Sequence, residues 1–436
     1  MPATLRTTNL SADERQAPSM RPFLVVWLGQ ACSLLGSQLV QFALVWWLTK
    51  TTGSATTLAL ASLAALLPQI LIGPFAGALV DRWSRRTIMI VADTAIALAT
   101  LVLAALFWLN VAAVWNIYVL LLIRATGAAF HWPAMQASTT LMVPEKHLAR
   151  VAGLNQTLAG VAGIFIPPCG ALAIEVLPMQ GVLAIDVATA IPAIVSLLLI
   201  AIPQPRRTRR PEAATRKPSV WADMREGLHF LLNWKALMTF SAIGIVINLL
   251  GRAAGSLAPL LVTQSFKGGA LELGWWQSAI GIGAVMGGVI LGVWGGLRRR
   301  AVTSLLALAL DGLAIVVIAL SPQDAFVLAL VAVFCVGLLE TIVFGLNGAI
   351  GQAIIPPEMQ GRVFSLLMSV AQVMAPLGLL IAGPFADAFG VRLWWVLTGI
   401  VIAVMGTSAL FVPAIVHIED RGLTEKSCRE AANLYD

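Results

Sequence analysis

The sequence Gly73-Pro-Phe-Ala-Gly-Ala-Leu-Val-Asp-Arg-Trp-Ser-Arg-Arg86 leaves one long apolar stretch, makes a short charged turn and enters the next apolar stretch. An acid, Asp81, lies in this turn among three arginines. Gly73 and Gly77 have the G-x-x-x-G spacing that lets a neighbouring membrane helix approach closely. The stretch therefore predicts two membrane helices joined by a tight, charged hinge.

The composition excludes a water-soluble domain. Apolar residues make up 59% of the chain and charged residues 11%, and the mean hydropathy is +0.88. Soluble domains carry roughly 25% charged residues, so the charged side chains here are too few to cover a water-facing surface. Lipid is the expected solvent, and the predicted fold class is all-α integral membrane.

Twelve apolar segments are long enough to cross a membrane, because a spanning helix needs about 20 apolar residues. They start near residues 22, 55, 87, 114, 151, 182, 236, 271, 301, 325, 362 and 391. Of the 28 basic residues, only Lys50, Lys267 and Arg392 fall in connectors on one face, and two more fall inside spans. The positive-inside rule makes the other face cytoplasmic and predicts that both termini lie there.

Two stretches repeat between the halves of the chain. The segment Val143-Pro-Glu-Lys-His-Leu-Ala-Arg150 matches Ile355-Pro-Pro-Glu-Met-Gln-Gly-Arg362 at an offset of 212 residues, and each precedes the fifth span of its half. We therefore predict two pseudo-symmetric six-helix bundles joined by a basic linker with an amphipathic helix. The expected parts are a tail at 1–21, a bundle at 22–203, the linker at 204–235, a second bundle at 236–416 and a tail at 417–436.

The hinge resembles the G-x-L-x-D-R-x-x-R-R signature of the major facilitator superfamily, here Gly77 to Arg86. In the fourth span, the stretch that begins with Arg124-Ala-Thr-Gly127 resembles the same stretch in the drug-efflux branch of the family, particularly in macrolide-efflux-like proteins. The fifth span resembles the antiporter signature of the family, with Ile166 and Ala171 in place of two glycines. The resemblance implies the major facilitator fold and an antiporter-like bend formed by Gly163, Pro167, Pro168 and Gly170.

The resemblance also implies a role for the hinge, because in the family this cluster holds the two halves in the outward-facing state. A plain topological anchor is the alternative, and it would need the arginines but not the acid. Asp93 lies about two turns into the third span, so an ion pair with the hinge arginines or with Arg124 is expected. The predicted hinge latch is Gly73, Gly77, Asp81, Arg82, Arg85, Arg86 and Asp93.

Polar residues at helical spacing form one stripe on each of spans one, four, seven and ten. In the family these four spans line the central cavity, so the resemblance implies that the stripes face the substrate. Charged residues inside spans are functional candidates because burying them without a partner is costly. The predicted cavity residues are Gln30, Ser37, Gln41, Arg124, His131, Trp132, Asn248, Arg252, Phe344 and Asn347.

Three titratable residues are candidates for proton coupling. Glu340 is the first choice, and a permanent ion pair with Arg124 or Arg252 is the competing interpretation. His131 has a side chain whose ordinary pKa is about 6.5, so it could relay protons, or it could form a helix-to-helix hydrogen bond. Asp186 is placed early in span six, near the outer surface, where it could be hydrated and take up protons.

The predicted function is proton-coupled efflux of lipophilic drugs, such as macrolides or other antibiotics, by alternating access in the bacterial inner membrane. The alternative is export of a natural product, siderophore or lysophospholipid on the same fold, and an importer or a non-transport membrane protein ranks below both. We expect no enzymatic activity, cofactor, metal or nucleic-acid partner, since the chain has no P-loop, paired cysteines or basic domain. The expected partners are protons, membrane lipid and a small lipophilic substrate, and the expected state is a monomer.

Overall fold

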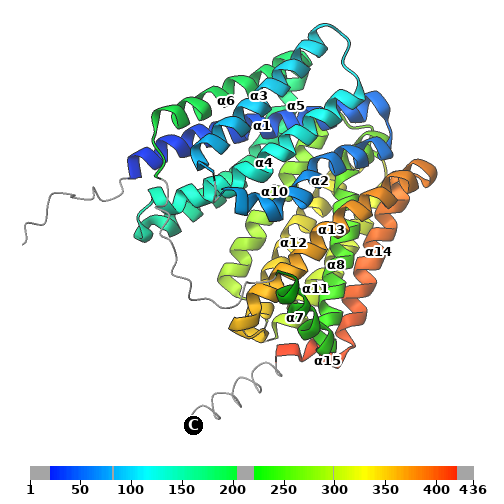
Figure 1. The fold of residues 1–436 in the computed structure, drawn as a ribbon. Coiled ribbons are helices and arrows are strands. Elements are labelled where there is room, and N and C mark those ends of the chain that lie inside the picture. Colours follow the sequence, from blue (N-terminus) through cyan, green and yellow to red (C-terminus); the bar gives the residue numbers. More distant parts are fainter. Residues whose placement is uncertain (1–19, 81–82, 204–219, 298, 420–436) are drawn as a thin grey trace, which may run out of the picture.

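The computed structural model describes residues 20–80, 83–203, 220–297 and 299–419 (Figure 1). This part of the chain is helical, contains no strand, and has twelve helices long and apolar enough to cross a membrane. The prediction of an all-α membrane fold with twelve spans is confirmed, and each predicted start lies within a few residues of the observed helix. The twelve helices are α1 (Met20–Thr52), α2 (Ala55–Val80), α3 (Arg85–Trp108), α4 (Val114–Met142), α5 (Leu148–Val176), α6 (Met179–Leu199), α8 (Lys235–Ser256), α10 (Ala270–Trp294), α11 (Arg300–Leu320), α12 (Phe326–Ile354), α13 (Pro357–Phe389) and α14 (Val391–Leu410).

Short elements complete the described chain. The 3₁₀ turn η1 (Glu145–His147) precedes α5, and α9 (Ala258–Leu260) with the π-helical turn η2 (Leu261–Ser265) follows α8. Helix α15 (Pro413–Val416) follows α14. The predicted amphipathic segment corresponds to α7 (Val220–Asn233), which packs against α13, where Arg362 forms an ion pair with Glu226 at 2.8 Å.

Local sequence explains where several helices begin and end. Ser84 caps α3 by accepting a hydrogen bond from the backbone N–H of Thr87. Pro178 and Pro356 directly precede α6 and α13, where a missing backbone N–H costs little. Gly390 alone separates α13 from α14 and has a φ of 92°, a conformation that favours glycine. The chain can therefore reverse its direction across the membrane within one residue.

The helices form two bundles, α1 to α6 and α8 to α14 (Figure 1). In the first bundle α3 packs on both α4 and α6, and in the second α11 packs on both α12 and α14. One pairing differs between the bundles: α1 packs extensively on α6, whereas its counterpart α8 packs mainly on α13 and only slightly on α14. The bundles are thus related in their helix arrangement but not identical in their packing.

The two bundles meet along two helix pairs, α5 with α10 and α2 with α13. Glycines allow the first pair to come into backbone contact. A Cβ atom on Gly274 would lie 3.0 Å from Cα of Pro168, and one on Gly281 would lie 3.0 Å from the carbonyl oxygen of Gly163. The small-residue spacing of these spans therefore serves the interface between the bundles.

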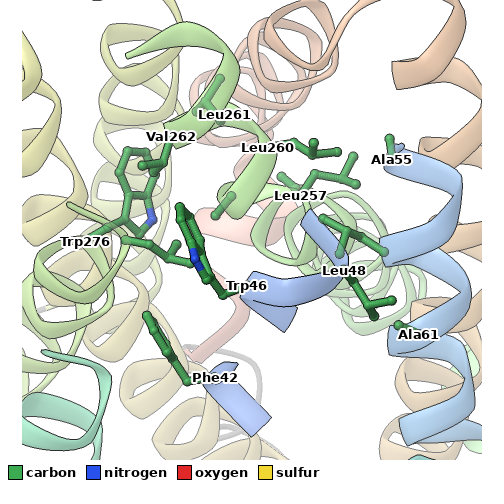
Figure 2. Close-up of a cluster of buried hydrophobic side chains, with 14 of the residues drawn as sticks. Phe42, Trp46, Leu48, Ala55, Ala61, Leu257, Leu260, Leu261, Val262 and Trp276 are labelled. Carbon is green, nitrogen blue, oxygen red and sulfur yellow. The ribbon is translucent and has the colours of Figure 1, made fainter. Parts of the chain in front are cut away.

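The bundles are joined at one end of the molecule and separate at the other. We call the end where α1 begins, α6 ends and α8 begins the linker end, and the opposite end the far end. At the far end one cluster of buried side chains contains residues of both bundles, with Trp46 and Leu48 packed near Leu257 and Val262 (Figure 2). At the linker end the described buried residues form separate clusters, each confined to one bundle.

Candidate functional site

A cavity of about 330 Å³ lies inside the first bundle. Helices α1 to α6 all contribute to its wall, and apolar side chains such as Trp27, Trp132 and Leu158 form much of it. Its polar lining residues come from several of these helices: Gln30, Ser33, Ser37, Gln41, Gln69, Asp93, Arg124, His131, Asn155 and Asp186. Six of the ten residues predicted for the substrate cavity therefore share one cavity: Gln30, Ser37, Gln41, Arg124, His131 and Trp132.

An ion pair between Arg124 on α4 and Asp186 on α6 occupies one side of this cavity. Nη1 of Arg124 lies 2.5 Å from Oδ2 of Asp186, whose side chain is 2% exposed. The hydroxyls of Ser37 and Thr100 also donate to this carboxylate, at 2.8 and 3.1 Å. A buried carboxylate with a guanidinium and two hydroxyl donors is fully satisfied, so the pair is a stable part of the cavity wall.

The structure bears on two expectations about this pair. Asp186 was placed near the outer surface, where it could be hydrated, but its side chain is buried against Arg124. Its role in proton coupling stays a prediction. Helix α6 begins at Met179, so Asp186 lies seven residues into the helix, about 10 Å along its axis. Of the two arginines considered as partners of Glu340, Arg124 is engaged elsewhere, because its guanidinium donates to Asp186, Thr100 and the backbone carbonyl of Ser37. A pair of Glu340 with Arg252 stays an open interpretation.

A second polar contact joins α1, α3 and α4. The side-chain amide of Gln30 donates to Oδ2 of Asp93 at 2.9 Å, and Nε2 of His131 lies 3.4 Å from Oδ1 of the same carboxylate. His131 is therefore a helix-to-helix partner of an acid and still lines the cavity. The expected partner of Asp93 was a hinge arginine or Arg124, and this expectation is wrong, because the carboxylate contacts His131 and Gln30.

The hinge is described only in part, since Asp81 and Arg82 lie outside the described residues. Nη1 of Arg85 donates to the carbonyl of Ala137 on α4 at 2.8 Å. The guanidinium of Arg86 donates to the carbonyls of Leu197 and Leu198 at the end of α6, at 2.5 and 2.6 Å. A cation at the C-terminus of a helix satisfies free carbonyls and the helix dipole, so Arg86 ties the start of α3 to the end of α6. Arg85 joins α3 to α4 in the same bundle, at a carbonyl five residues before the end of α4. The role of the hinge as a latch stays a prediction.

The proline motif of the fifth span lies at the interface between the bundles. Helix α5 continues through Pro167 and Pro168. Because Pro168 has no backbone N–H, the carbonyl of Ile164 loses its partner within the helix, and the hydroxyl of Ser278 on α10 donates to that carbonyl at 2.5 Å. Gly170 faces the ring of Phe42, 3.0 Å from where its Cβ would lie. The motif therefore exposes a backbone acceptor to the other bundle.

The predicted site residues of the second bundle are not part of the cavity in the first. Arg252 and Glu340 are exposed, Phe344 is 73% exposed, and Asn248 is half-buried. Asn347 accepts a hydrogen bond from Ser304 at 2.6 Å. Glu340 lies within electrostatic range of Arg252 and of Asp311, a buried acid on α11. The structure thus brings the first-bundle residues together and leaves those of the second bundle apart from them.

Sequence reasoning missed several residues that the structure places at these contacts. Asn155 lines the cavity and accepts a hydrogen bond from the indole of Trp27 at 2.7 Å. Thr100 lies behind the cavity wall and donates to Asp186. Ser278 and Asp387 bind the opposite bundle. A weak signal existed for Thr100, which lies seven residues after Asp93 on the same face of its helix. Nothing in the local sequence distinguishes Asp387 from an ordinary acid at the end of a span.

Comparison with known proteins agrees with this architecture. The family model described as Major Facilitator Superfamily matches residues 26–379. Macrolide efflux protein A of Streptococcus pyogenes is 34% identical over 380 residues, covering 87% of this chain and 93% of the relative. Multidrug efflux pump Tap of Mycolicibacterium fortuitum is 28% identical over 408 residues, covering 91% of this chain and 97% of the relative.

Solved structures support the fold. The crystal structure of a bacterial homolog of the human lysosomal transporter Spinster, inward-facing and unoccupied, has a TM-score of 0.65 and 15% identity. It covers 93% of this chain, which in turn covers 97% of it. Together with the twelve spans and the two bundles, these similarities identify the family. The chain belongs to the Major Facilitator Superfamily, and its curated relatives are drug-efflux transporters rather than enzymes.

Proposed function

We propose that this protein exports lipophilic, cationic drugs in exchange for protons, by alternating access across a bacterial plasma membrane. The relatives named for macrolide and multidrug efflux support export and the drug class. A macrolide with a protonated amino group is one such substrate. The proposal includes a monomer with no bound cofactor, driven by the proton gradient.

The conformation supports alternating access. We assign the linker end to the cytoplasm, because the basic residues of the chain concentrate at that face. The cluster shared by both bundles then closes the outer side, while the cytoplasmic ends are separate. This arrangement corresponds to an inward-open state that receives a substrate from the cytosol or the inner leaflet. An outward-open state would require the far ends to part and the linker ends to meet.

The charge balance of the cavity is the observation that carries the substrate assignment. Among the residues that line it, Arg124 compensates Asp186, which leaves the carboxylate of Asp93 beside His131. With neutral His131 the cavity carries one net negative charge, and with protonated His131 it carries none. Apolar walls with one uncompensated carboxylate favour a lipophilic cation, and the indoles of Trp27 and Trp132 add surface for cation–π contact.

Proton coupling requires a group that gains and loses a proton in each cycle. Glu340 stays our first choice, because it is an exposed acid inside a span and no hydrogen bond to it occurs within the described residues. His131 is a second candidate, since its protonation removes the net charge that attracts the drug. Protonation from outside would release the drug, and deprotonation toward the cytosol would restore the binding form.

Transport by everted membrane vesicles tests the proposal. With an acidic lumen, vesicles containing the unchanged protein should accumulate a lipophilic cationic dye, and vesicles containing Glu340→Gln should not. The same variant should still exchange labelled for unlabelled dye without a gradient, because the drug cavity is intact. Glu272→Gln is the matched control, since Glu272 only caps the start of α10. Full gradient-driven accumulation by Glu340→Gln would show that Glu340 does not carry the proton.

A further inference from the structure

Asp387, near the end of α13 in the second bundle, binds the first turn of α2 in the first bundle. Its Oδ1 accepts a hydrogen bond from the backbone N–H of Ala55 at 2.6 Å. Its Oδ2 accepts two more, from the backbone N–H of Thr56 and from the hydroxyl of Ser54, both at 2.9 Å. Both oxygens of one carboxylate are therefore engaged by the opposite bundle.

These bonds complete the cap of α2. The first four N–H groups of a helix have no partner within the helix. In α2 the first two donate to Asp387, the third donates to the hydroxyl of Ser54 and the fourth to the carbonyl of Ser54. Half of the cap is thus supplied by a residue more than 300 positions away in the chain. A negative charge at this position also interacts favourably with the helix dipole.

The surrounding contacts fit a reversible closure. Gly383, one turn before Asp387, allows α13 to approach α2 so closely that a Cβ on it would lie 2.9 Å from Cα of Thr56. Gln264, which follows α9, donates to the carbonyl of Gly53 at 3.2 Å as a second polar link between the bundles. Asp387 itself is exposed, so water can replace its partners when they separate. Buried apolar contacts and these polar links close the same end of the molecule.

We propose that Asp387 is an outer clasp: it stabilises the inward-open state by capping α2 and must release α2 whenever the outer ends separate. The inference rests on alternating access as the proposed mechanism. The strength of the clasp then sets the balance between the two conformations in the absence of drug. An asparagine would keep one acceptor oxygen, lose the charge and leave one of the two backbone N–H groups without its acceptor. Asp387→Asn should therefore shift the protein toward the outward-open state.

Distances between spin labels test the clasp in purified, full-length protein on a cysteine-free background. One label pair, at Val111 and Gln323, reports the separation of the outer ends, and another, at Lys146 and Gln352, reports the linker ends. Asp387→Asn should raise the ratio of outward-open to inward-open protein about tenfold, the effect expected from the loss of a helix cap. The outer distance should lengthen in the same molecules in which the inner distance shortens.

Glu272→Gln is the matched control for this experiment. Glu272 also caps a helix at the outer side, accepting from the backbone N–H of Gly269 at 2.7 Å, but both residues belong to the second bundle. Its substitution removes an equivalent carboxylate without breaking a link between the bundles, so the distances should not change. A shift in Glu272→Gln as large as that in Asp387→Asn would overturn the proposal, and so would unchanged distances in Asp387→Asn.

Two milder variants keep the test decisive if Asp387→Asn does not fold. Asp387→Glu retains the charge and should restore most of the inward-open population. Ser54→Ala removes one of the three hydrogen bonds and should shift the population in the same direction by a smaller factor. The clasp is refuted if Asp387→Glu does not keep the inward-open population and Ser54→Ala does not shift the population toward the outward-open state. A different result would contradict alternating access itself. In that case the outer and inner distances of the unchanged protein would stay fixed, with or without a cationic dye and at every pH tested.

Discussion

The interiors of the two bundles differ more than their folds. In the described part of the first bundle the buried acids are Asp93 and Asp186, and each contacts a basic side chain. In the second bundle Asp311 is 2% exposed and its Oδ1 has no hydrogen-bond partner among the described residues, while Glu340 is exposed. The helix packing differs as well. In the first bundle α1 packs extensively on α6, whereas in the second bundle α8 contacts α14 only slightly. The bundles share a scaffold, but their polar residues have diverged.

Under the proposed function, this difference would separate two tasks of a proton-coupled exporter. The first bundle has a formed cavity in which Arg124 compensates Asp186 and the carboxylate of Asp93 lies beside His131, which suits the recognition of a lipophilic cation. The second bundle keeps an acid and an arginine inside its spans, Glu340 and Arg252, for which no hydrogen bond occurs among the described residues, and this suits a change of protonation during the cycle. We therefore interpret the asymmetry as a division between drug binding and proton binding.

The largest effect should come from breaking the ion pair of the first bundle. Arg124→Ala would leave Asp186 buried without its cation, so the free energy of unfolding should fall by about 3–5 kcal/mol. Denaturant titration of the purified protein in detergent measures this change. The exposed Arg252 is the matched control in the second bundle, and Arg252→Ala should change the same free energy by less than about 0.5 kcal/mol.

Replacing both members of the pair checks the physical reason. Arg124→Met combined with Asp186→Leu removes both charges, so the double variant should be clearly more stable than Arg124→Ala alone. If Arg124→Ala and Arg252→Ala lowered the free energy of unfolding equally, the two bundles would not differ in their dependence on a compensated buried charge.

An intermediate effect is expected for binding. Asp93→Asn should weaken the binding of a lipophilic cationic dye about tenfold or more, because a charged hydrogen bond or ion contact contributes about 1.5–3 kcal/mol. Fluorescence titration of purified protein gives the Kd. Asp311→Asn, the same substitution at a buried acid of the second bundle, should leave that Kd within about twofold, since Asp311 does not line the cavity. The reverse order would place the cation site in the second bundle.

The smallest effect should be found where the two bundles touch. Ser278→Ala removes the donor to the free carbonyl of Ile164 and should lower the free energy of unfolding by about 1 kcal/mol. Ser256→Ala is the control, because the hydroxyl of Ser256 donates to Ala253 within its own helix. Indistinguishable stabilities for the two variants would show that the proline-generated carbonyl does not need its partner from the other bundle.

The sequence predicted the span positions well because apolar length is a local property. It also predicted one wall of the cavity, since Gln30, Arg124 and His131 lie on stripes that periodicity reveals. It failed on their partners. The pairing of Arg124 with Asp186 depends on how α4 and α6 are rotated and on the exact start of α6, which sequence alone placed three residues too late.

By itself, the sequence determined that this is a helical membrane protein with twelve spans, two related bundles and a few charges within the membrane, because each of these follows from residue type and spacing. Only the tertiary structure decided which charges are compensated, that the formed cavity belongs to the first bundle, and that Asp387 caps a helix of the other bundle. Those facts depend on contacts between helices far apart in the chain, whose rotation and depth no local pattern specifies.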